Sequence, residues 1–148
     1  MQSQNQDKAR VSIEARYRIL LILWFAILNS VALFFGMTLF IPRPEAAEAN
    51  SILALTLTGV GILTAIVSFV VKKKLLEQAA EKQQPTQVQS AYIIAFALSE
   101  VASLFGLLMY MITAERYYYL MFIVSAVCML AHFPRREHLL ATVFKNQR

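Results

Sequence analysis

The sequence predicts an all-α integral membrane protein in which four transmembrane helices form one bundle, a single membrane domain over residues 1–148. Hydrophobic residues make up 58% of the chain and charged residues only 16%, which is outside the usual range of soluble proteins. The apolar residues also lie in four blocks, each near the length of about 20 helical residues that crosses a bilayer. A water-soluble fold is therefore disfavoured.

The predicted spans follow from these blocks and from the charges and prolines that bound them. The first covers about residues 19–41 and carries no charge, and the second covers about 52–71 and ends at a run of lysines. The third, about 91–112, contains one ionisable residue, Glu100. The fourth, about 117–133, is short, so it spans if flanking arginines snorkel or the bilayer thins locally. A cleavable signal peptide is the alternative for the first block, but that block is too long and three spans follow it.

Basic residues near the span ends predict the orientation. Twelve of the fourteen Lys and Arg residues lie before the first span, between the second and third, or after the fourth. Only Arg43 and Arg116 lie on the other side. We therefore expect both termini and the middle loop to be cytoplasmic, most simply at a bacterial inner membrane. The net charge of +5 then predicts attraction to anionic lipid headgroups, and no nucleic-acid role is needed to explain it.

Two segments outside the spans have patterns of their own. Residues 72–84 are almost all good helix formers, so the second helix should extend into the cytoplasm. The tail, residues 134–148, is typical of an interfacial helix because four apolar residues share one face among basic ones: Leu139, Leu140, Val143 and Phe144.

A short internal repeat relates the first and third spans. Residues 28–36 and 98–106 are identical at five of nine positions. Duplication of a hairpin would make the bundle two parallel-related hairpins, residues 17–71 and 91–133. Chance similarity between apolar helices is an equal alternative.

Small residues four positions apart predict where helices pack closely. Such pairs let another helix backbone approach, and we interpret them as packing seams rather than as ligand sites. Three of these pairs contain a glycine: Ala32 with Gly36, Gly61 with Ala65, and Ala102 with Gly106; Thr64 with Ser68 is a further pair in the second span.

Glu100 is the residue most suited to chemistry, since it is the only acid inside any predicted span. It lies about 13 Å from the inner end of its span at 1.5 Å per residue, close to the bilayer midplane. An ionised carboxylate there needs a partner or water, so we expect this group to be protonated. It would either bind an ion or form a hydrogen bond that holds two helices together. Its candidate partners are Ser103 on the same helix and, at equal depth in the first helix, Asn29 and Ser30.

The run around this acid resembles a known helix. Residues 97–107, ALSEVASLFGL, are similar to the second helix of the proteolipid c subunit of rotary ATP synthases, and Lys82 to Pro85 is similar to its polar loop. The resemblance implies that Glu100 carries a proton or a sodium ion and that the second and third spans form a c-like hairpin. The second span departs from the family, because it has only Gly59 and Gly61 where the family has a long run of alternate glycines.

Other chemistry has little support in the sequence. Cys128 is the single cysteine, and His132 and His138 have no paired histidine at matching depth in another span, so we expect no metal site and no cofactor. No phosphate-binding loop or nucleophile motif is present, and an enzyme is not expected.

Two functions remain. The preferred one is a structural or accessory subunit that docks onto other membrane subunits or onto itself. The alternative is proton or sodium translocation through Glu100. We favour the first because a single buried acid without a second relay residue makes a poor pathway alone.

Overall fold

The protein is helical throughout most of its length. The computed structural model describes the backbone of residues 2–42, 51–113 and 115–142, with side chains from residue 11 onward in these ranges. No strand occurs in them, which confirms the all-α class. The elements are α1 (Gln2–Phe40), α2 (Ser51–Glu81), α3 (Pro85–Ile112), the 3₁₀ turn η1 (Arg116–Tyr118), α4 (Tyr119–Ala131) and α5 (Arg136–Ala141).

Three of the helices are long and apolar enough to cross a membrane: Val11–Phe40, Ser51–Glu81 and Pro85–Ile112. A shorter apolar helix, Arg116–Ala131, follows them. The structure thus confirms the helical class, and the length and composition of these helices fit a membrane protein. The helices exceed the predicted spans at their polar ends, since α1 begins at Gln2 and α2 continues past its lysines to Glu81.

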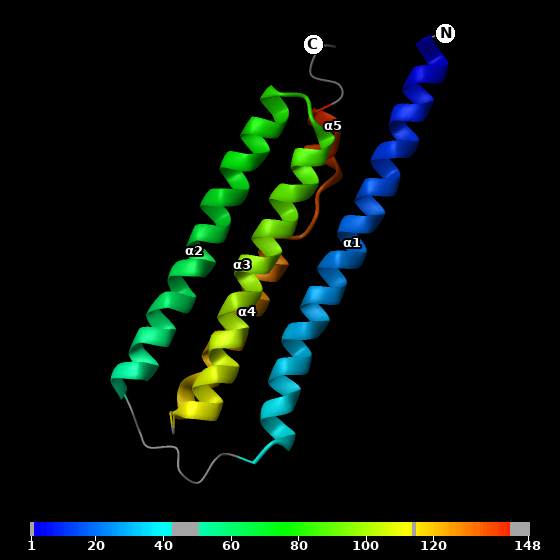
Figure 1. Cartoon of the computed structure of the whole chain (residues 1–148). Coiled ribbons are helices and arrows are strands. Elements are labelled where there is room, and N and C mark those ends of the chain that lie inside the picture. Colours follow the sequence, from blue (N-terminus) through cyan, green and yellow to red (C-terminus); the bar gives the residue numbers. More distant parts are fainter. Residues whose placement is uncertain (1, 43–50, 114, 143–148) are drawn as a thin grey trace.

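Successive long helices run in alternating directions (Figure 1). The start of α1, the turn between α2 and α3, and α5 lie at one end of the bundle, and the end of α1 lies at the other. We call the end that holds the α2–α3 turn and α5 the basic end, because it carries most of the described basic residues: Arg16, Arg18, Lys72, Lys73, Lys74, Lys82, Arg135 and Arg136.

α3 is the central helix, and it packs against α1, α2 and α4. Within the most apolar stretch of each helix, 44% of the residues are buried in α3 but only 11% in α1. Near the basic end the core gathers around Tyr92 and Phe96 of α3, which pack with Leu20 of α1 and Met129 of α4. α1 is therefore the peripheral helix of the bundle.

Glycines allow α4 to lie close to α2 and α3. A Cβ built on Gly106 would lie 3.0 Å from Met121 Cβ and 3.2 Å from the carbonyl oxygen of Tyr118. A Cβ on Gly61 would meet the end of the same Met121 side chain. Ala65 and Ala102 are also buried. Two of the three glycine-containing pairs thus lie inside the bundle.

The third pair, Ala32 with Gly36, is placed differently. A Cβ on Gly36 would have nothing within 4 Å, and Ala32 is exposed. Among the described residues, no helix covers this step of α1.

α5 folds back under the basic end. Leu139 is fully buried there, whereas Leu140 is 40% exposed. Arg136 Nη2 lies 3.0 Å from Glu14 Oε1 of α1, which joins α5 to the first helix. The other two residues of the predicted apolar face, Val143 and Phe144, lie outside the described residues.

Candidate functional site

Glu100 of α3 faces Ser30 of α1, and the Ser30 hydroxyl forms a hydrogen bond with Glu100 Oε1. The same hydroxyl lies 2.8 Å from the backbone carbonyl of Ile27, which accepts from it. A serine hydroxyl has one proton, so it can donate fully to only one of these acceptors. The Ser30 hydroxyl is therefore shared between the two acceptors, and its contact with Glu100 joins α1 to α3.

The other two candidate partners do not reach this carboxyl. Ser103 is buried, and its hydroxyl donates to the backbone carbonyl of Glu100 at 2.7 Å, which is an intrahelical contact. Asn29 is exposed on α1. In the described part of the chain, ion pairs join Glu14 to Arg18 and Arg136, and none involves Glu100. The structure thus brings together one hydroxyl and one carboxyl from the predicted set.

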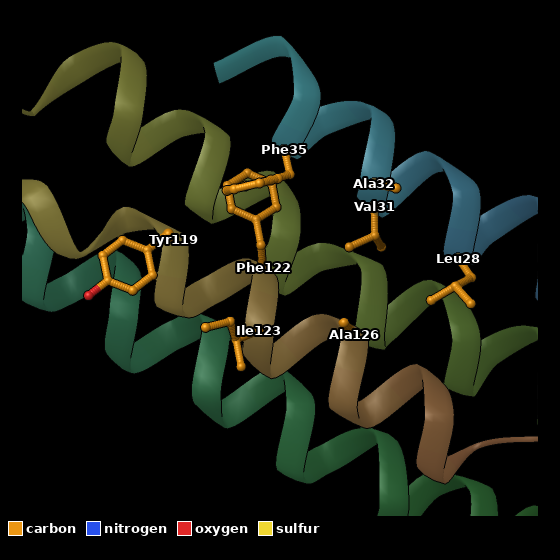
Figure 2. Close-up of a pocket in the computed structure, with 8 residues that line it drawn as sticks. All are labelled: Leu28, Val31, Ala32, Phe35, Tyr119, Phe122, Ile123 and Ala126. Carbon is orange, nitrogen blue, oxygen red and sulfur yellow. The ribbon is translucent and has the colours of Figure 1, made fainter. Parts of the chain in front are cut away.

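A groove of about 360 Å³ lies between α1 and α4 (Figure 2). Phe35 and Phe122 meet across it with their ring centroids 5.5 Å apart. Its lining is apolar or aromatic throughout, with four residues from each helix: Leu28, Val31, Ala32, Phe35, Tyr119, Phe122, Ile123 and Ala126. The Tyr119 hydroxyl is the one polar side-chain group in this lining, so the groove mainly offers contact to an apolar chain or helix.

A polar network at the basic end was not anticipated from the sequence. Ser68 of α2 and His132, just after α4, are both fully buried, and Ser68 Oγ lies 2.9 Å from His132 Nε2. Lys72 Nζ lies 3.5 Å from His132 Nδ1 and 4.3 Å from the centre of the Tyr92 ring. The Tyr92 hydroxyl lies 2.6 Å from Nδ1 of His138. The network therefore joins α2, α3, α4 and α5.

One sequence signal pointed toward this network. Ser68 and Lys72 are four residues apart and so share a face of α2. Nothing local to the two histidines shows that they lie beside that face, because the contacts depend on how α4 ends. α4 stops at Ala131, and Pro134 follows the turn that includes His132.

The second histidine of the network is held in its neutral form. Burial lowers the pKa of His138 below the ordinary 6.5, and the charges of Lys72 and Arg135 lower it further, against a smaller opposing effect of Glu137. A neutral His138 can accept a hydrogen bond at Nδ1 from the Tyr92 hydroxyl. The same hydroxyl accepts from the backbone N–H of Arg135 at 3.1 Å.

Acidification should therefore loosen α5. Because the folded pKa of His138 lies below its unfolded value, the unfolded tail binds the proton first. The contribution of neutral His138 to the stability of the folded protein is present above about pH 6.5 and is lost as the pH falls below that value. Protonation also removes the acceptor for Tyr92 and adds a third cation beside Lys72 and Arg135.

Hydrogen–deuterium exchange of residues 136–142 in detergent at about pH 7.5 and about pH 5.5 measures this loosening. After correction for intrinsic exchange, the wild-type segment should lose protection at the lower pH. His138→Gln is the control, because glutamine can accept from Tyr92 but does not titrate. Equal protection of the wild type at both pH values would contradict the prediction.

Comparison with known proteins does not assign this site. No protein-family model matches the chain, and neither the curated proteins nor the solved structures contain a match. Within the described ranges, no group of three or more His, Cys, Asp or Glu side chains is arranged to hold a metal ion.

Proposed function

We propose that this protein is a structural or accessory subunit of a larger membrane complex, and that α1 binds a transmembrane helix of another subunit. In this proposal all four apolar helices span the bilayer, α4 by local thinning or snorkelling at Arg116 and Arg135. The basic end is cytoplasmic, as the distribution of Lys and Arg predicts.

The internal repeat supports two parallel-related hairpins, α1–α2 and α3–α4. Ser30 and Glu100 occupy equivalent positions of the repeat, 70 residues apart, and they touch each other. Residues near the axis of a two-fold arrangement contact their own equivalents. A contact between equivalent residues is therefore what such a pair of hairpins would produce.

The uncovered step on α1 carries the functional proposal. Gly106 of α3 is covered by Met121 and Phe122 of α4, whereas its equivalent, Gly36 of α1, has nothing within 4 Å. α1 thus lacks the helix that α4 supplies to α3. An exposed small-residue step lets a transmembrane helix approach closely, and the neighbouring apolar groove adds contact area. We therefore take the missing occupant to be a helix of a partner subunit.

Substitution of Gly36 tests this proposal. Gly36→Leu should release the protein from its native assembly, because the leucine side chain would stand where the partner backbone must approach. Membranes solubilised in mild detergent and separated on native gels should show the variant at lower mass than the wild type.

Gly59→Leu is the matched control, because a Cβ on Gly59 also has nothing within 4 Å but lies on α2, away from the groove. Its assembly should be unchanged. If Gly36→Leu migrates with the wild type, the docking role of α1 is wrong. If the assembly contains only this chain, the partner is a second copy.

Ion translocation through Glu100 is the second candidate function, in line with the resemblance of α3 to a proteolipid helix. One observation favours it: the carboxyl is half-buried in an apolar helix and, in the described part of the chain, has no cationic partner. Labelling by a hydrophobic carbodiimide, which attacks protonated carboxyls in lipid, would support a carrier only if Glu100→Gln also abolished proton or sodium flux in vesicles.

A further inference from the structure

A second cavity, of about 380 Å³, opens at the basic end between α2 and α5. Its polar lining consists of Lys72 and Lys73 of α2, His138 of α5, and the exposed Glu77. Phe69, Leu76 and Ala80 form its apolar wall. The cavity therefore lies where the apolar part of α2 gives way to its lysines.

Among the described residues, Lys72 has no ion-pair partner. Its side chain is half-buried, and its Nζ contacts the face of the Tyr92 ring and Nδ1 of His132. No carboxylate of the described residues forms an ion pair with it. Holding a cation partly out of water without an opposite charge is unfavourable, so an anion in the cavity would relieve the penalty.

Two further cations strengthen the preference for an anion. Lys73 lines the same cavity, and Arg135 lies close enough to His138 to lower its pKa. Glu77 is the one acid in the lining, and it is exposed; Glu137 also acts on His138, so three cations face two acids. The balance of charge around the cavity is therefore positive.

The surface next to the cavity indicates what the anion is attached to. Below Lys72, α2 exposes a continuous apolar face toward the bundle surface: Ile66 is 57% exposed, Phe69 42% and Val70 51%. A molecule with an anionic head at the lysines would have its tail along this face. We propose that the cavity binds the phosphate of an anionic phospholipid headgroup, with the acyl chains against α2. This site is separate from the partner-binding step on α1, and its failure would leave that proposal standing.

Native mass spectrometry of the full chain in neutral detergent tests the site. Phosphatidylglycerol should remain bound to the wild type, and phosphatidylcholine should bind more weakly because its headgroup carries no net charge. Lys73→Gln should weaken phosphatidylglycerol binding about fivefold, the change that corresponds to about 1 kcal/mol for one lysine near a lipid surface. Lys72→Gln should weaken binding at least as much.

Lys74→Gln is the matched control, since Lys74 is exposed beside Lys73 but does not line the cavity. It should retain wild-type binding. In the described part of the chain, the hydrogen bonds of His132 are made with Ser68 and Lys72 and not with Lys73, so Lys73→Gln keeps the test valid even if Lys72→Gln fails to fold. Equal loss in the Lys73 and Lys74 variants, or equal binding of the two lipids, would overturn the proposal. Full competition by millimolar inorganic phosphate would overturn the lipid as the source of the anion.

Discussion

Gly106→Leu is expected to destabilise the protein by about 1–3 kcal/mol, the usual effect of overpacking a close-packed interface. The reason is geometric. The added Cβ would lie 3.0 Å from Met121 Cβ, 3.1 Å from Phe122 Cε2 and 3.2 Å from the Tyr118 carbonyl oxygen. Met121 Cβ is bonded to the α4 backbone, and the Tyr118 carbonyl belongs to the backbone of η1. Both η1 and α4 must therefore move as a whole to make room.

Unfolding of the purified protein in mixed micelles, followed by circular dichroism, measures this effect. Gly59→Leu is the control, because its added side chain meets open space. Leucine has a higher helix propensity than glycine by roughly 0.8–1 kcal/mol, so the control should be neutral or stabilised. If both variants unfold at the same denaturant concentration as the wild type, the close approach of α4 to α3 is wrong.

Ser30→Ala and Glu100→Met are expected to be coupled by about 0.6–1.7 kcal/mol, the range for hydrogen bonds between membrane helices. The Ser30–Glu100 contact is a polar tie between the peripheral α1 and the central α3. Removal of either partner leaves the other without its contact in apolar surroundings, so each single variant should lose stability. The double variant should lose less than the sum of the two.

Trp24 provides a local measurement for this cycle. It is the only tryptophan of the chain, and its indole N–H donates to the Met129 carbonyl of α4 at 2.7 Å. Its fluorescence therefore reports whether α1 is docked. Asn29→Ala serves as the control, because Asn29 is exposed and should show no coupling to Glu100→Met. Additive effects of Ser30→Ala and Glu100→Met would show that the contact does not hold α1.

The helical class and the long apolar helices could be predicted from the sequence, because both depend on local properties of the chain. A run such as residues 52–71 is apolar enough to cross a bilayer whatever lies beside it. Likewise, Pro85 begins α3 because proline fits the first turn of a helix and needs no N–H partner there. The orientation inferred from the basic residues stays a prediction.

The sequence predicts the residues of the candidate site only in part. Depth along the helix placed Asn29 and Ser30 level with Glu100, but the rotation of α1 decides that Ser30 faces the acid and Asn29 does not. The small-residue pairs were equally ambiguous. Gly36 and Gly106 have similar neighbours in sequence, yet α4 covers one and no described helix covers the other.

By itself, then, the sequence determined a helical chain with long apolar segments and a strongly basic set of connecting segments. Only the tertiary structure decided which polar groups meet: Ser30 with Glu100, Ser68 with His132, and Tyr92 with His138. The physical reason is that apolar periodicity sets which segments leave water, whereas these contacts depend on the rotation and end point of each helix. Those are settled by side-chain packing between helices distant in sequence.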